Sequence, residues 1–167
     1  MSKIIASVTI VALTAMLVGT FALAATTGSV SATVTASVVA VTVSDGAVAY
    51  GTVSTTADTT STGVDDTQVV TNTGTVNEDF EMKGQNSTGQ VWTLAGAAGD
   101  ATYAHKTCVA TCDSTPTWSA LTTSYTDRAT GKAPSATTDL DLQVTVPTSN
   151  PGVGQATLPV DILASAS

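Results

Sequence analysis

The sequence predicts an all-β protein, an Ig-like or jelly-roll β-sandwich with an N-terminal extension strand. Valine and threonine, which are β-branched and favour strands, recur in alternating runs through residues 25–167. Clusters of Gly, Asp, Asn and Ser separate these runs at the spacing typical of sandwich proteins. No part of residues 25–167 has a convincing helical period of apolar residues.

Residues 1–24 are predicted to be a signal peptide. Lys3 gives the positive N-terminal region, and residues 4–23 form an uncharged apolar stretch. Ala22 and Ala24 place small residues at the positions that signal peptidase reads. We therefore expect cleavage after Ala24 and a secreted protein, extracellular or on the cell surface. The alternative is an uncleaved membrane anchor, because about 20 apolar residues can span a bilayer.

The composition argues against several classes of function. The chain has 13 Asp and Glu against 5 Lys and Arg, a net charge of −8. We therefore expect no nucleic-acid partner, because such partners are attracted by clustered cations. With one histidine, two cysteines and no glycine-rich phosphate loop, we expect neither an enzyme nor a cofactor. Leu, Ile, Val and Phe make up only 26 of residues 25–167, about 18%, which predicts a thin core that needs support from a disulfide, a cation, glycans or neighbouring subunits.

The most informative segment is residues 30–38, where apolar and polar residues alternate strictly. Its apolar face consists of Val30, Ala32, Val34, Ala36 and Val38. We therefore divide the mature chain into an N-terminal donor-type strand, residues 25–38, and a sandwich domain, residues 39–167. The strand can complete its own sheet or the sheet of a neighbouring copy, because both use the same main-chain hydrogen bonds.

The sandwich strands are expected to follow in order. After the phase change at Val39, apolar residues continue to a turn at residues 44–46, and a returning strand is expected at 47–53. Residues 54–66 are expected to be an exposed loop. Further strands are expected at residues 67–71, 76–83, 91–94, 102–107, 118–125, 140–146 and 156–162. The residues expected to line the core or an acceptor groove are Val41, Val43, Trp92, Leu142, Val144, Val160 and Ile162.

The two cysteines are expected to form a disulfide, because the predicted compartment is oxidising. Cys108 and Cys112 would close a small surface loop and hold its shape. A zinc site would need further ligands, and only His105 is near in sequence. His105 itself is expected to pack or hydrogen-bond within its strand. Asn86 begins an Asn-x-Thr glycosylation acceptor in a predicted turn.

Pairs of acidic residues lie along two predicted strands. Asp79 and Glu81 share one strand face, and Asp139 and Asp141 share another. The alternation is expected to turn all four outward, where they form a solvated face. Calcium is the alternative, because it binds carboxylate and carbonyl oxygens. Since no EF-hand or calcium-repeat spacing is present, we assign no metal site.

Residues 70–76 read Val-Thr-Asn-Thr-Gly-Thr-Val. This motif, the secretion signal, the alternating N-terminal strand and the Thr/Val-rich domain resemble secreted prokaryotic surface β-sandwich proteins. Within that group the chain is similar to subunits of extracellular, pilus-like filaments assembled by donor-strand complementation. It departs from chaperone–usher pilins in its tight cysteine pair, where those subunits usually join distant strands. The resemblance implies a head-to-tail homopolymer, in which Val30, Val34 and Val38 insert into the next copy, that supports adhesion or biofilm.

A second function class remains open. The chain would then be a monomeric secreted module that binds a carbohydrate or a cell-surface partner. Its site would lie in the loops around Cys108 and Cys112, Trp118 and Tyr125. Exposed aromatic side chains favour this function, whereas a buried Trp118 counts against it.

Overall fold

The computed structural model describes residues 31–54, 58–60, 66–110, 112–149, 152 and 154–167. The chain divides into two units, residues 1–35 and residues 36–167. The predicted signal peptide and Val30 lie outside the described residues. In the part of the chain that is described, no helix has the length and apolar character needed to cross a membrane.

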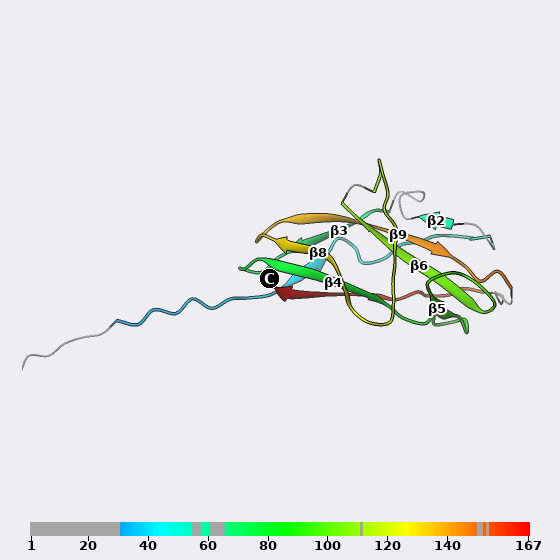
Figure 1. Ribbon diagram of the computed structural model, residues 1–167, viewed down its shortest axis with the longest axis horizontal. Helices are drawn as coiled ribbons and strands as arrows, with labels where there is room; N and C mark the ends of the chain where they lie inside the picture. The colour runs from blue at the N-terminus through cyan, green and yellow to red at the C-terminus, as the bar shows by residue number, and fades with distance from the viewer. Residues whose placement is uncertain (1–30, 55–57, 61–65, 111, 150–151, 153) are drawn as a thin grey trace, which may run out of the picture. The chain divides into compact units, whose positions relative to one another are not determined.

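Residues 36–167 form an all-β sandwich of two sheets, as the sequence predicts (Figure 1). The larger sheet has the order β1-β3-β9-β6-β5. These strands are β1 (Val41–Val43), β3 (Gln68–Asn72), β9 (Thr137–Thr145), β6 (Thr102–Val109) and β5 (Thr93–Ala95). Two short strands join it, β2 (Asp58–Thr60) beside β9 and β7 (Ser119–Ala120) beside β6. The smaller sheet has the order β10-β4-β8, with β10 (Val160–Ala166), β4 (Glu78–Gly84) and β8 (Thr126–Lys132).

Alternating side chains from both sheets form the core. In β4, Phe80 and Met82 are fully buried, and they pair with Ala164 and Ile162 of β10. Leu142 and Val144 of β9 belong to the buried core as well. Other expected core residues, Val41, Trp92, Val160 and Ile162, pack against it but stay partly exposed, and Val43 is half-buried. The core therefore lies between the two sheets and is incompletely covered at some margins.

The motif at residues 70–76 builds the crossing from the larger sheet to the smaller one. Asn72 is fully buried, and its Nδ2 donates to the carbonyl oxygens of Val76 and Lys132, at 2.8 Å each. Its Oδ1 accepts from the Gly74 N–H at 2.8 Å. A Cβ at Gly74 would collide with the Glu78 carboxylate and the Val38 carbonyl. The motif therefore has a structural role, independent of any filament.

Several strand boundaries differ from the sequence prediction. Residues 47–53 form no strand, and β2 lies inside the stretch expected to be a loop. The expected strand at 118–125 is only β7, and β8 follows it where no strand was predicted. β9 begins at Thr137 rather than at 140, and β10 is shifted toward the C-terminus. β8 escaped prediction because it is an edge strand of mostly polar residues, which gives no apolar alternation.

Candidate functional site

The described part of the predicted donor segment is exposed to solvent and forms no strand. Val34 is 95% exposed, and Ala32 and Ala36 are exposed too. Pairing with the domain begins at Val38, whose N–H donates to Thr75 Oγ1 and whose carbonyl accepts from the Thr75 N–H, each at 2.9 Å. Val38 is therefore hydrogen-bonded to the sandwich domain, whereas residues 31–37 form no strand.

The chain then docks along β3. The Thr73 N–H donates to the Ala40 carbonyl at 2.8 Å, and the Ala40 N–H donates to Glu78 Oε1 at 2.8 Å. Glu78 is fully buried, and its Oε2 has no hydrogen-bond partner among the described residues. Glu78 is not among the residues that the sequence singles out as functional. Its position two residues before Phe80 was the available signal, because it puts the carboxylate on the inward face.

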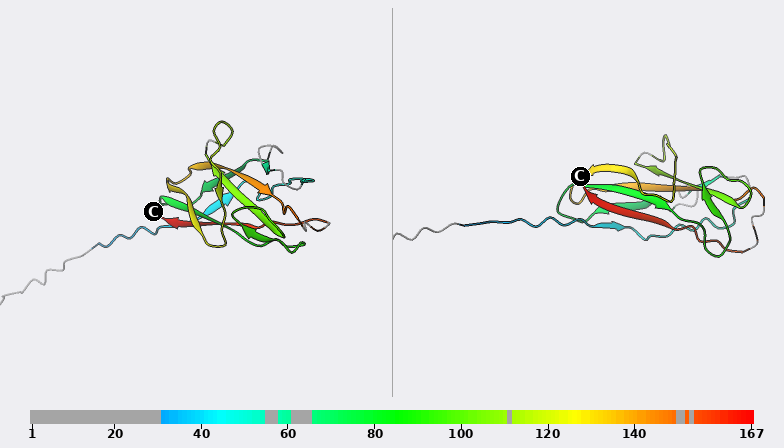
Figure 2. Two further views of the ribbon diagram at one scale, coloured as in Figure 1. Left: turned by 45° about the vertical axis from the view of Figure 1, so that its right-hand side comes forward. Right: turned by 60° about the horizontal axis from the view of Figure 1, so that its bottom comes forward.

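We call β1 and β10 together the apolar edge. Each is the last strand of its sheet, and both lie on the same side of the sandwich (Figures 1 and 2). Their side chains that pack against the core while only partly buried are Val41, Val160, Ile162 and Ala164. Next to them, Val39 is 41% exposed and Leu163 is 42% exposed. This edge thus presents apolar surface beside two unpaired strand margins.

The expected disulfide between Cys108 and Cys112 is present, with 5.7 Å between the Cα atoms. Both cysteines are buried. Inside the ring, Ala110 has a φ of 77°, in the left-handed region that side chains rarely adopt. Its N–H donates to the Asp139 carbonyl at 2.9 Å. The disulfide therefore constrains the end of β6, directly after Thr107.

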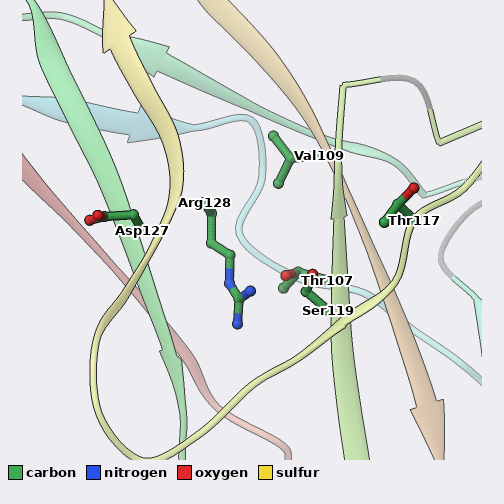
Figure 3. Close-up of a pocket in the computed structure, with 6 residues that line it drawn as sticks. All are labelled: Thr107, Val109, Thr117, Ser119, Asp127 and Arg128. Atoms are coloured by element: carbon green, nitrogen blue, oxygen red, sulfur yellow. The ribbon is translucent and has the colours of Figure 1, made fainter.

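On the other margin, β8 and the β6–β7 pair enclose a recess of about 220 Å³, which we call the polar recess (Figure 3). It is lined by Thr107, Val109, Thr117, Ser119, Asp127 and Arg128. Arg128 Nη2 donates to the Ala120 carbonyl at 2.7 Å, which connects β8 with β7. The recess is therefore a gap between the two sheets that side chains of both sheets line.

The polar recess contains two buried polar atoms without hydrogen-bond partners in the described residues, Arg128 Nε and Thr107 Oγ1. In Figure 3 the Arg128 guanidinium faces Thr107 and Ser119, while Asp127 points away from it. Burial lowers the pKa of Arg128. The sequence pattern does not indicate this site, because Arg128 lies on β8, a strand that apolar alternation does not predict.

Two aromatic residues named for the binding-module alternative lie near this recess in the sequence. Trp118, between Thr117 and Ser119, is half-buried, and Tyr125 is 37% exposed. Lys83 Nζ lies 4.6 Å from the centroid of the Tyr125 ring. Trp118 is therefore neither fully exposed nor part of the buried core.

A buried polar cluster involves His105, which is 1% exposed. Its Nε2 lies 3.3 Å from the Tyr50 hydroxyl oxygen, and its ring contacts Tyr103. Burial lowers the pKa of His105 to about 4. The pKa of Tyr50 is raised, mainly by burial and then by the charges of Asp66 and Asp141. The cluster therefore holds a neutral imidazole at neutral pH.

The predicted solvated face of four acids is only partly correct. Asp139 is exposed, but Asp141 is 1% exposed and accepts a hydrogen bond from Thr67 Oγ1 at 2.7 Å. Asp79 and Glu81 are half-buried. Asp79 Oδ1 accepts from Ser167 and from the Gly131 N–H, and these two bonds lower the pKa of Asp79. Asp141 differs because other parts of the chain cover its face of the larger sheet.

The remaining sequence candidates can also be placed. Asn86 is exposed, and its Oδ1 accepts from the Leu94 N–H at 3.0 Å. Among the described residues, no three His, Cys, Asp or Glu side chains gather in a way that could hold a metal ion. Comparison of the chain with protein-family models, with curated proteins and with solved structures gives no match.

Proposed function

We propose that this protein is a secreted structural subunit of an extracellular filament or surface layer. Residues 31–37 of one copy add as a strand to the apolar edge of the next copy, which makes the polymer head-to-tail. The supporting observation is the exposure of Val34, 95%, in a segment whose alternation suits a half-buried strand. Through the polymer, the protein supports adhesion or biofilm, and the proposal includes no catalytic step.

Strand addition has a physical driving force here. An extended segment gains main-chain hydrogen bonds from an unpaired strand margin, and its alternate side chains fill apolar gaps. Burial of apolar surface contributes roughly 25 cal/mol per Å². In one copy Val34 stays in water, and so does part of the surface of Ile162. Association of two copies would cover both surfaces at once.

The apolar edge suits this segment better than the β8 margin does. The inward side chains of β10, Val160 and Ile162, are apolar and incompletely covered, so an inserted valine completes the core. The β8 margin instead opens on a recess lined by Arg128, and a valine inserted there would leave the Arg128 Nε–H without a hydrogen-bond acceptor. Seven residues also span about 23 Å, which matches the seven residues of β10.

Electron microscopy of the secreted, cleaved chain is the first test. The intact chain should form filaments, and a chain without residues 25–37 should stay monomeric. The deletion ends before Val38 so that the Val38–Thr75 bonds remain. A monodisperse monomer of the intact chain at high concentration would contradict the proposal.

A matched pair of point variants separates strand insertion from a general effect of charge. Val34→Asp places a carboxylate on the apolar face, and Thr35→Asp places the same charge on the opposite face, one residue away. Both residues are exposed, so neither change should affect folding. Filaments should be lost with Val34→Asp and retained with Thr35→Asp. Equal loss in both variants would show that the alternating face is not what inserts.

Cross-linking identifies the acceptor margin. One batch of protein carries Thr35→Cys, and a second carries either Leu163→Cys on β10 or Asp127→Cys on β8, both at exposed positions. After mixing, a short bis-maleimide should join Thr35→Cys to Leu163→Cys. Preferential cross-linking to Asp127→Cys would show that the acceptor strand is β8 instead of β10, and would still support polymerisation by strand addition.

The second candidate function is a secreted module that binds a carbohydrate or a cell-surface partner. The observation that favours it is the polar recess, which lies beside Trp118 in the region predicted for such a site. Glycan-array binding by the Val34→Asp variant, compared with the same variant carrying Trp118→Ala, tests it. Binding that depends on Trp118 would support this function, and an array without signal would count against a carbohydrate ligand.

A further inference from the structure

We propose that the polar recess is a binding site for a carboxylate group, which Arg128 and the Thr107 hydroxyl hold. The inference does not depend on polymerisation. It rests on the second candidate function and deepens it, because it names the chemistry of the ligand.

The first argument is the state of Arg128. A guanidinium has five N–H donors, and its Nη2 already donates to the Ala120 carbonyl at 2.7 Å, which fixes its position. The Nε donor is buried and has no hydrogen-bond partner in the described part of the chain. No described carboxylate forms an ion pair with Arg128. Among the described residues, the ion pair that forms joins Lys83 of β4 and Asp161 of β10. A fixed guanidinium with free donors suits a carboxylate, which can accept two N–H bonds in parallel.

The second argument is independent and concerns Thr107. This residue is 1% exposed, lines the same recess, and its Oγ1 has no hydrogen-bond partner among the described residues. Leaving a buried hydroxyl unpaired costs stability, and a valine of the same shape would avoid that cost. Figure 3 places Thr107 and Ser119 opposite the Arg128 guanidinium. Thr107, Ser119 and Arg128 thus line one recess, and all three side chains can donate to an anion.

The size of the recess restricts the ligand. At about 220 Å³ it is smaller than the 300–1,000 Å³ typical of sites for drug-sized molecules. It therefore takes a carboxyl group with the few carbon atoms attached to it. Both a simple carboxylic acid and the carboxyl end of an acidic sugar meet this description. The net charge of −8 works against anions at long range, so affinity must come from the local donors.

Nuclear magnetic resonance can observe the Arg128 Nε–H group directly. The protein is the secreted chain with Val34→Asp, which keeps the sandwich monomeric if the chain polymerises. Acetate, glucuronate and glucose are titrated separately at constant ionic strength, with sodium chloride as the reference anion. Acetate and glucuronate should shift the Arg128 Nε–H signal to saturation, and glucose and chloride should not. Tighter binding of glucuronate than of acetate would identify an acidic sugar as the source of the carboxylate.

Variants test the assigned roles. Arg128→Lys should weaken carboxylate binding at least tenfold, because it removes the forked donor geometry. Thr107→Val should weaken carboxylate binding several-fold. Thr130→Val, at an exposed position on β8, the strand that carries Arg128, should leave binding unchanged. If Arg128→Lys fails to fold, Ser119→Asp serves instead, because its carboxylate would occupy the site and abolish the titration.

The outcomes distinguish this inference from both candidate functions. Absence of a saturable shift with acetate and with glucuronate would overturn it. Glucose binding that is unaffected by Arg128→Lys would overturn it too, yet would leave the carbohydrate-binding function standing. Filament formation is read from the Val34 and Thr35 variants, so its failure has no bearing on the recess.

Discussion

The sandwich is open at two margins, and they differ in chemistry. At the apolar edge, the side chains that remain partly exposed are Val41, Val160 and Ile162. At the polar recess, Arg128 Nε and Thr107 Oγ1 have no hydrogen-bond partner among the residues that the structure describes. The first margin lacks apolar cover and the second lacks hydrogen-bond partners. One fold can therefore present a margin suited to a strand and a margin suited to a polar ligand.

Introducing an aspartate at each margin should have opposite effects on the free energy of unfolding, and this is the largest effect that we expect. Ile162→Asp puts a charge among core side chains and should lower the free energy of unfolding by about 4 kcal/mol. Ser119→Asp puts the same charge in the recess lined by Arg128, where we expect a gain of about 1 kcal/mol. Urea unfolding at pH 7 measures both.

Two neutral variants complete that test. Ile162→Asn separates loss of packing from the effect of charge, and Ser119→Asn separates space filling from the ion pair with Arg128. If Ser119→Asp and Ser119→Asn destabilise equally, the recess does not favour a negative charge. Similar losses for Ile162→Asp and Ser119→Asp would remove the contrast between the two margins.

The sequence predicted the apolar edge far better than the polar recess. Apolar alternation places Val160 and Ile162 on one face of a strand, and in the structure both side chains pack against the core. The disulfide was predictable because the spacing of Cys108 and Cys112 allows the bond and the expected compartment favours it. Local patterns of this kind depend on a few neighbouring residues, so a single sequence can reveal them.

The recess was beyond sequence reasoning because its residues come from distant parts of the chain. Arg128 lies on a polar edge strand without alternation, and Thr107 looks like any strand threonine until β8 packs beside it. Glu78 and Asp141 show a related limit. Alternation gives the face on which a carboxylate lies, but burial of that face depends on tertiary cover.

Acidification should destabilise the sandwich through His105, whose ring is buried on β6. Its pKa is about 4 in the folded chain against 6.5 for an ordinary histidine, so the unfolded state binds the proton first. Stability should be full above pH 6.5, fall as the pH drops toward 4, and level off below that. The total loss is about 3 kcal/mol, measured by urea unfolding across this range.

A variant without a titrating ring provides the control. The titratable groups that face His105 are Tyr50 and Tyr103, whose pKa values are both raised by burial, so both stay neutral throughout this range. His105→Phe should remove most of the pH dependence, and part of what remains comes from Asp79, whose pKa is lowered by its hydrogen bonds from Ser167 and from the Gly131 N–H. An unchanged pH profile in His105→Phe would mean that His105 is not the group responsible.

Removal of the disulfide by substitution should raise local opening at the recess more than at the apolar edge. The ring from Cys108 to Cys112 is short, so its removal should cost about 2 kcal/mol by the chain-entropy relation. Because Thr107 and Val109 flank Cys108, hydrogen exchange after Cys108→Ser with Cys112→Ser should rise at the end of β6. Exchange in β10 should change little. An equal rise in β10 would show that the two margins are coupled through the core.

The smallest expected effect is also the most specific to the recess. Thr107→Val removes a buried hydroxyl that has no partner in the described residues and keeps the shape of the side chain. Without ligand, the free energy of unfolding should therefore rise by about 1 kcal/mol. Thr138→Val is a useful comparison, because Thr138 is also buried with an unpartnered Oγ1 but lies outside the recess.

Both substitutions should stabilise the chain in thermal unfolding without ligand. With saturating carboxylate, Thr107→Val should no longer be more stable than the unsubstituted chain, because only the unsubstituted chain binds the carboxylate through the hydroxyl. Thr138→Val should remain more stable with and without carboxylate. If Thr107→Val is stabilising to the same extent with and without carboxylate, the hydroxyl makes no contact with the ligand. The difference between these two threonines therefore separates a hydroxyl that serves binding from one that is only a cost to the fold.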